Sequence, residues 1–199
     1  MPVVLAIDTA APRLQLALLA GDGTVDSLVE DMAQGQAERI FPAIAELLAR
    51  NRNAYADLGR IAVTTGPGSF TGLRIGLSAA RGLGLSLDLP VIGVPSLSAI
   101  ALAAPTTPVA VLLDARRSEA YVQVFGAGPS APQVLPVAEA QALIPEGAAV
   151  ITSPFPDIAL LARFAATADP ADFPPDPVYV RGADAKPQEA ARIARAPAA

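Results

Sequence analysis

The sequence contains no cysteine, no histidine and no tryptophan, and its only lysine is Lys186. Without cysteine there is no disulfide, no thiolate nucleophile and no thiolate ligand for zinc. Without histidine, a Ser-His-Asp triad, a histidine general base and an HExxH metal site are excluded. Composition alone therefore closes most of the common routes to catalysis.

Charged residues are scarce as well, at 17% of a chain that is 52% hydrophobic and carries a net charge of −5. Proteins that hold nucleic acid by themselves usually have a basic face, so this balance argues against autonomous tRNA binding. The apolar stretches 73–87 and 89–104 are interrupted by arginines or prolines, and neither provides the ~20 uninterrupted apolar residues of a membrane span. Asp8 interrupts the apolar N-terminus, which excludes a signal peptide pattern. We expect a cytoplasmic protein with no membrane contact.

Hydrophobic patterning over the first hundred residues alternates between strand and helix periods. Strands are predicted at 3–7, 14–20 and 24–30 and, after a helix, at 60–66 and 90–94. Helices are predicted at 36–50, 71–87 and 96–104, and Pro42 indicates that the first is kinked or begins near Phe41. This order predicts an α/β lobe with a mixed sheet over residues 1–104.

The second half repeats this opening weakly. After the turn-rich segment 104–108, residues 109–126 form the pattern strand, Asp, turn, strand that also occurs at 3–20. Helices near 137–144 and 155–166 and strands near 148–152 and 178–181 follow. We expect a smaller α/β lobe over 105–181 and an Ala-, Pro- and Arg-rich tail over 182–199.

The stretch TTGPGSFTGLRIG, residues 64–76, resembles a phosphate-binding loop only superficially. It lacks the lysine of GxxxxGK[ST] and the third glycine of GxGxxG. A sharp strand-to-helix turn is the favoured interpretation, with Pro67 fixing φ and Gly66 or Gly68 taking a positive φ. An anion held by the backbone N–H groups at the helix start is the alternative.

The helix after this loop has small residues spaced four apart, so that they share one face: Gly72, Gly76, Ala80 and Gly84. Glycine costs about 1 kcal/mol against alanine inside a helix, so the stripe calls for an explanation. One explanation is close packing on the protein's own sheet. The other is a groove for a partner helix, flanked by Leu73, Leu77, Arg74 and Arg81.

Two aspartates end corresponding strands of the two halves, Asp8 in the first and Asp114 in the second. Facing a cleft, they could order a magnesium ion or act as a base, and with Thr9 they are the candidates for a nucleotide site. The alternative is that they cap strand-end turns, as aspartates commonly do.

Three stretches, VLAIDTA, VTTGPGSFTGLRIGLSAARGLGLSLDLPVIGVPSLSAIA and YVRGADAKP, resemble the TsaB (YeaZ) family. That resemblance implies the two-lobed actin/Hsp70/sugar-kinase fold with mixed sheets and a reduced second lobe. It also implies a non-catalytic subunit that is needed for threonylcarbamoyl transfer to the tRNA adenosine next to the anticodon. Residues 127–175 match the family poorly, and GQAER stands where relatives commonly show an Arg-x-His-Ser helix opening.

In the family, the helices that correspond to 36–50 and 71–87 bind the catalytic subunit TsaD. Transferred here, the resemblance implies a partner surface formed by Ile40, Phe41, Ile44, Leu73, Arg74, Gly76, Leu77, Ala80, Arg81 and Gly84. It further implies TsaE in a larger assembly, tRNA contact only through the complex, and no cofactor or metal. A separate hypothesis is a self-associating protein, in which the same helices form a homodimer when the partner is absent. The competing hypothesis is a small actin-like ATPase or kinase that uses Asp8 and Asp114 around Mg-ATP.

Overall fold

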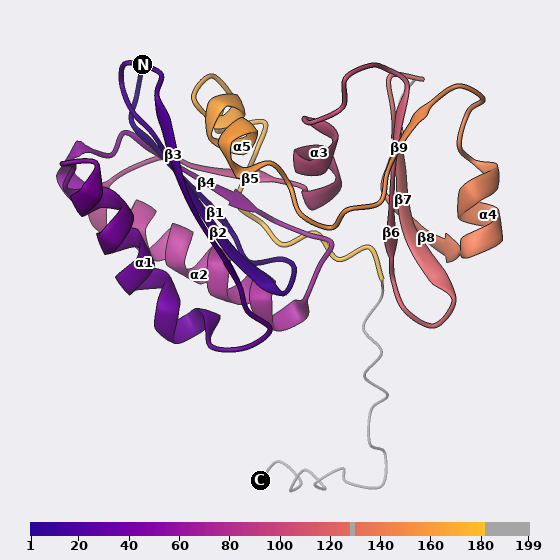
Figure 1. Cartoon of the computed structure of the whole chain (residues 1–199), viewed down its shortest axis with the longest axis horizontal. Helices are drawn as coiled ribbons and strands as arrows, with labels where there is room; N and C mark the ends of the chain where they lie inside the picture. Colours follow the sequence, from indigo (N-terminus) through magenta and orange to yellow (C-terminus); the bar gives the residue numbers. More distant parts are fainter. Residues whose placement is uncertain (128–129, 182–199) are drawn as a thin grey trace, which may run out of the picture.

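A computed structural model describes residues 1–127 and 130–181 of the chain. Two mixed β-sheets lie side by side with helices before, between and after them (Figure 1). The tail expected over residues 182–199 lies outside the described residues.

The first sheet has five strands in the order β3-β2-β1-β4-β5. The central strand β1 is antiparallel to β2 and parallel to β4, and β5 is parallel to β4. The strands are β1 (Val4–Asp8), β2 (Arg13–Leu19), β3 (Val25–Asp31), β4 (Arg60–Thr64) and β5 (Val91–Val94). Every residue of β1 is buried, as expected of a strand covered on both faces.

Helices cover both faces of the first sheet. On one face, α1 (Gln36–Arg50) and α2 (Phe70–Leu87) bury apolar side chains against β1, β2 and β4. On the other face lies α5 (Ile158–Ala165), whose Ile158, Leu161 and Ala162 pack with Val4 and Ala6 of β1. The second face of the first sheet is therefore covered by a helix that follows the second sheet in the sequence.

The second sheet is smaller, with the order β8-β7-β6-β9. Its strands are β6 (Val109–Asp114), β7 (Glu119–Phe125), β8 (Gln133–Pro136) and β9 (Ala149–Ile151). One face packs on α3 (Ser96–Ala101) through Leu97 and Ile100, and the other on α4 (Val137–Ala142) through Ala140.

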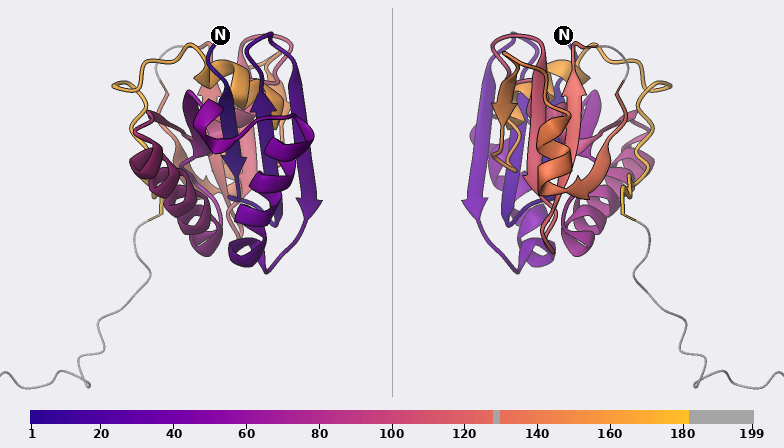
Figure 2. Two further views of the ribbon diagram at one scale, coloured as in Figure 1. Left: turned by 90° about the vertical axis from the view of Figure 1, so that its left-hand side faces the viewer. Right: turned by 90° about the vertical axis from the view of Figure 1, so that its right-hand side faces the viewer.

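The two sheets share one topology. β6 is antiparallel to β7 and parallel to β9, just as β1 is to β2 and β4, so the second sheet repeats the first without its fifth strand. α3 and α5 lie between the sheets, α1 and α2 cover one end of the molecule, and α4 covers the other (Figures 1 and 2). The expected α/β fold, with two mixed sheets of which the second is smaller, is confirmed.

Several local expectations are corrected. α1 spans the predicted range 36–50 and runs through the exposed Pro42, so only the alternative start near Phe41 is wrong. Burial of Ile40 and Ile44, together with a 3.2 Å hydrogen bond from Gln36 Nε2 to Ala11 O, holds the first turn despite the N–H that proline lacks. The sequence patterns missed β8 and a 3₁₀ turn at Tyr55–Asp57, and the segment 178–181 is not a strand. Ser96 is not the N-cap of α3: Pro95 occupies that position without a side-chain cap hydrogen bond, and the Ser96 hydroxyl accepts a hydrogen bond from Gly66 N.

Candidate interaction surface and the cleft between the sheets

The glycine-rich loop before α2 packs on the connection between β1 and β2. Gly66 has a φ of +109°, and a Cβ on Gly68 would lie 2.5 Å from Ala10 O. Ser69 N donates to Ala10 O at 2.7 Å, and the Ser69 hydroxyl caps the helix by accepting from Gly72 N at 3.3 Å. The close approach that the glycines allow is thus made by the chain's own backbone, which agrees with the turn interpretation.

The small-residue stripe of α2 faces the first sheet. Thr9 Oγ1 donates to Gly72 O at 2.7 Å, and a Cβ on Gly76 would lie 2.5 Å from that same oxygen of Thr9. Ala80 is fully buried, and a Cβ on Gly84 would overlap the side chain of Val91. Of the two explanations for the stripe, close packing on the protein's own sheet is the one the structure shows.

The residues expected to bind a partner are consequently divided between the two sides of the helices. Buried in the core are Ile40, Ile44, Leu73, Gly76, Leu77, Ala80 and Gly84. Phe41, Arg74 and Arg81 are exposed. These three are the exposed residues among the ten.

An open groove of about 530 Å³ runs between the outer sides of α1 and α2. Ala37, Ile40, Phe41, Phe70, Thr71, Arg74, Ile75, Ser78 and Ala79 line it. The guanidinium carbon of Arg74 lies 3.8 Å from the centroid of the Phe70 ring, close enough for a cation–π interaction. Phe70, Thr71, Ile75 and Ser78 were not identified from the sequence as candidate binding residues, although their helical spacing places them away from the glycine stripe.

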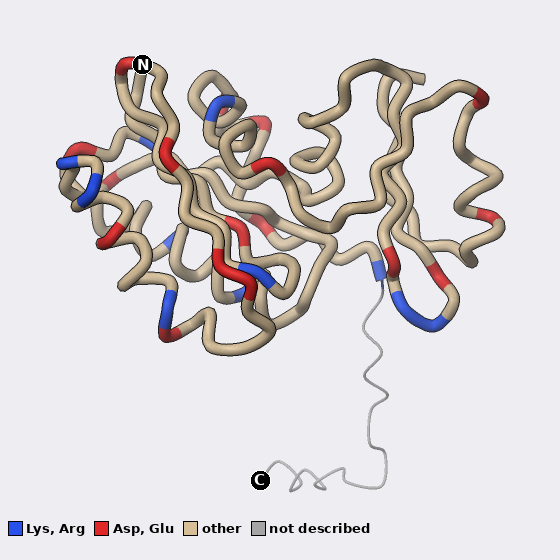
Figure 3. Tube along the Cα trace, in the orientation of Figure 1, with Lys and Arg blue, Asp and Glu red and all other residues tan. Residues whose placement is uncertain are grey.

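A second hollow, of about 590 Å³, lies between the start of α2 and the β6–β7 hairpin. Its walls include Gly68, Ser69, Asp114, Arg116 and Arg181. The hairpin tip is blue in Figure 3, and it lies near the blue end of the described chain. Asp114 Oδ1 accepts from Arg116 N at 2.7 Å, so this aspartate caps the turn, as one sequence interpretation expected.

Asp8 is completely buried. Its carboxylate accepts hydrogen bonds from Thr64 Oγ1 at 2.5 Å, Gln15 Nε2 at 3.0 Å and Ala10 N at 3.2 Å. Burial raises the pKa of Asp8 above its ordinary value, against the opposing effect of these donors. Thr9 is buried too, and the two aspartates do not face a common cavity, since Asp114 lines the hollow and Asp8 does not.

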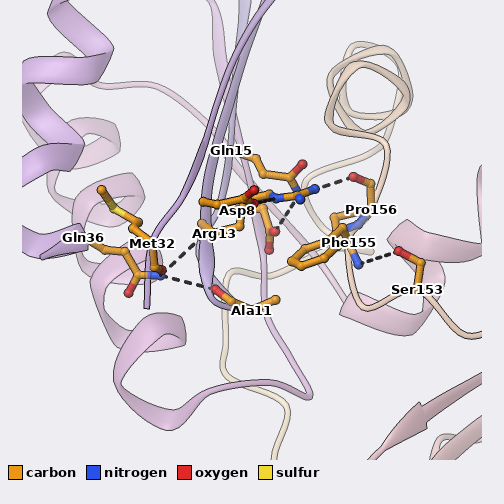
Figure 4. Close-up of polar contacts among 10 residues, drawn as sticks. Asp8, Ala11, Arg13, Gln15, Met32, Gln36, Ser153, Phe155 and Pro156 are labelled. Carbon is orange, nitrogen blue, oxygen red and sulfur yellow. Dashed lines mark hydrogen bonds and ion pairs between the residues drawn. The ribbon is translucent and has the colours of Figure 1, made fainter. Parts of the chain in front are cut away.

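Figure 4 shows what Asp8 is connected to. Gln15 Nε2, which donates to Asp8, also donates to Pro156 O at 3.3 Å. On the same hairpin, the guanidinium carbon of Arg13 lies 3.7 Å from the ring centroid of Phe155. The segment that joins β9 to α5 is therefore fastened to β1 and β2, and the Asp8 cluster is a junction between the two halves of the chain.

Within residues 1–127 and 130–181, no three acidic side chains gather as they would to hold a metal ion. The same part of the chain has no helix long and apolar enough to cross a membrane.

Comparison with known proteins decides the family. A family model described as "TsaD: tRNA N6-adenosine threonylcarbamoyltransferase" matches residues 30–162. The chain is 39% identical over 122 residues to the tRNA threonylcarbamoyladenosine biosynthesis protein TsaB of Escherichia coli (strain K12). The chain belongs to the TsaD-related TsaB (YeaZ) family. The E. coli match covers 59% of this chain and 52% of the relative, so the chain spans about half the length of that TsaB protein.

Two further relatives of the TsaB-family chain match over nearly its whole length. An uncharacterised Mycobacterium bovis protein is 36% identical over 207 residues, covering 92% of this chain and 94% of that protein. A Pseudomonas aeruginosa crystal structure, described as similar to peptidase YeaZ, superposes with a TM-score of 0.74 at 27% identity. It covers 91% of this chain and 100% of that one. The TsaB family resemblance expected from the sequence is confirmed.

Proposed function

We propose that this TsaB-family chain is a non-catalytic subunit of the machinery that makes threonylcarbamoyladenosine on tRNA. It acts by binding TsaD through the outer faces of α1 and α2, and TsaD carries out the transfer. The observation that carries the proposal is the open groove between these helices, with apolar and aromatic walls and an arginine at its edge.

The outer face of α2 suits a closely packed partner helix. Ser78 and Gly82 are exposed and share this face, and a Cβ on Gly82 would meet nothing within 4 Å. Small residues allow two helix backbones to approach, while exposed phenylalanine and arginine side chains are typical anchors of an interface. Arg74 and Arg81, the only charged residues of α2, are placed to pair with carboxylates of the partner.

A non-catalytic role is supported by the chemistry that the chain lacks. The whole sequence has neither histidine nor cysteine. The carboxylate of Asp8 accepts three hydrogen bonds from within the protein. A kinase that used Asp8 and Asp114 together would need both carboxylates at one ligand, and Asp8 exposes no surface.

The test compares two charge reversals on opposite sides of the first sheet. Arg74→Glu should weaken the affinity for purified TsaD from the same organism at least tenfold, which is about 1.4 kcal/mol. Arg163→Glu, an exposed position on α5, serves as the matched control and should bind normally. Equal binding by both variants would overturn the surface assignment. In a reconstituted tRNA modification assay, the chain should be required together with TsaD and inactive without it; modification by the chain alone would refute the non-catalytic role.

A further inference from the structure

The last described segment, residues 172–181, lies across both halves of the molecule. Phe173 O accepts a hydrogen bond from Gly93 N of β5, and Val178 N donates to Thr65 O just beyond β4, both at 2.8 Å. The Phe173 ring also packs edge-on against Phe164 of α5, with centroids 5.1 Å apart. The segment is thus held along the β4–β5 side of the first sheet.

Two glycines make this close contact possible. A Cβ on Gly66 would lie 2.7 Å from Val178 O, and a Cβ on Gly93 would overlap the backbone of Pro174 and Pro175. Any other residue at these positions would push the segment away from the sheet. The sheet is therefore shaped to receive the segment.

The far end of the segment is fastened to the second sheet. Arg181 donates to the carboxylate of Glu119 and, at 2.9 Å, to Ala115 O of the β6–β7 hairpin. Between the two attachments, the Tyr179 ring comes to lie beside Phe70 at the start of α2, with centroids 6.1 Å apart. Phe70 in turn is stacked on Arg74.

Tyr179, Phe70, Arg74 and Phe41 together form an exposed cluster, which we call the aromatic patch. The exposed fractions are 53% for Tyr179, 56% for Phe70 and 48% for Phe41, in a chain with only three tyrosines and six phenylalanines. Phe70 lines both the groove between α1 and α2 and the hollow between the start of α2 and the β6–β7 hairpin. Aromatic and arginine side chains grouped in this way are characteristic of the centre of a protein interface.

We infer that residues 172–181 belong to the TsaD-binding surface, with Tyr179 extending it beyond α1 and α2. This inference rests on the proposed function. The partner should present an apolar helix with a carboxylate opposite Arg74. A second copy of the chain fits less well, because two-fold pairing along α2 would set Arg74 and Arg81 against the same arginines.

The experiment measures TsaD affinity by calorimetry for the full chain and three variants. Tyr179→Ala should weaken binding about 10- to 30-fold, as loss of an interface anchor does, whereas Tyr179→Phe should bind normally because it keeps the ring. The control is Leu143→Ala, an exposed apolar truncation on the far side of the second sheet, which should leave affinity unchanged. Circular dichroism checks that each variant is folded; if Tyr179→Ala is not, Tyr179→Leu, which lacks the ring but stays apolar, replaces it.

The outcomes separate the two proposals. If the unmodified chain does not bind TsaD, the proposed function fails and the inference fails with it. If Arg74→Glu weakens binding but folded Tyr179→Ala binds within twofold of the unmodified chain, only the extension onto residues 172–181 is refuted. A third result, in which Tyr179→Ala weakens self-association in sedimentation but not TsaD affinity, would assign the patch to a homodimer and also overturn the inference.

Discussion

Replacing a glycine of α2 by alanine should have opposite effects on the two sides of the helix. Gly76 faces the sheet, and a Cβ there would lie 2.5 Å from Thr9 Oγ1 and about an ordinary contact distance, 3.6 Å, from Val63 Cγ2. Gly82 faces solvent, and a Cβ there would meet nothing within 4 Å. The substitution is chemically identical, so any difference in stability comes from the surroundings.

The magnitude follows from three contributions. Alanine is favoured over glycine inside a helix by about 1 kcal/mol at both positions. At Gly76 the Thr9 hydroxyl has to move, which breaks its buried hydrogen bond to Gly72 O and costs about 1–3 kcal/mol. Overpacking against β1 and β4 adds about 1–3 kcal/mol. The expected net effect is a loss of roughly 1–5 kcal/mol for Gly76→Ala and a gain of about 1 kcal/mol for Gly82→Ala.

Thermal unfolding followed by circular dichroism measures both variants. For a chain of this length, 1 kcal/mol corresponds to about 2–4 °C in Tm, so Gly76→Ala should melt roughly 2–20 °C lower and Gly82→Ala about 2–4 °C higher. If Gly76→Ala were as stable as Gly82→Ala, Thr9 would not be held against α2, and the assignment of the stripe to the core would be wrong.

Three other expectations concern the junction and α5. Because the folded state raises the pKa of Asp8 above its ordinary value near 3.8, this carboxyl group binds more protons in the folded than in the unfolded chain between the two pKa values. In urea titrations, the stability of the unmodified chain relative to Asp8→Asn should therefore fall as pH rises from about 4 through the raised pKa. The comparison isolates Asp8, because the lowered pKa values of Asp22, Asp26, Glu30 and Glu46 act in the opposite direction in both proteins. A slope unchanged in Asp8→Asn would contradict this. Leu161 is fully buried against the first sheet, so Leu161→Ala should lower the free energy of unfolding by about 2–5 kcal/mol in chemical denaturation. Leu85→Ala, at a side chain that is 88% exposed, should leave it almost unchanged. Similar losses in the two variants would show that α5 is not part of that core. Asp157→Ala should cost about 1 kcal/mol, since its carboxylate accepts from Ala159 N and Leu160 N at the start of α5, and an undiminished Tm would argue against the cap.

Local patterns were sufficient for most of the elements. Helical spacing located α1 and α2, because one side of each helix is buried and the other is not. Short apolar runs located β1, β2, β4 and β5, which are buried on both faces. The short strand β8 escaped notice, since its four residues have no fully buried face. The residues of segment 178–181 favour an extended backbone, and the sequence therefore predicts a strand there. The segment is not a strand, although Val178 N donates a backbone hydrogen bond to Thr65 O just beyond β4.

Which sheet a helix covers could not be predicted from the helix alone. α3 precedes the boundary expected at 104–108 and packs on the second sheet, while α5 follows that boundary and packs on the first. An apolar helix face predicts that the face is buried, but not which sheet buries it. The pairing depends on contacts far apart in the sequence, such as the hydrogen bond from Gln15 to Pro156 O, and neither segment shows these by itself.

The candidate site illustrates the same limit at the scale of one helix. α2 has small residues on two sides, the glycine stripe at 72, 76, 80 and 84 and the pair Ser78 and Gly82. Periodicity identifies both faces but assigns neither of them to the core. Thr9 and Val91 decide the matter, because they approach the glycine side so closely that a β-carbon does not fit. A partner can then reach only the outer side, where Phe70 and Arg74 stand. Since Phe70 also contacts Tyr179, more than a hundred residues away in the chain, the extent of that surface follows from the fold rather than from any one segment of the sequence.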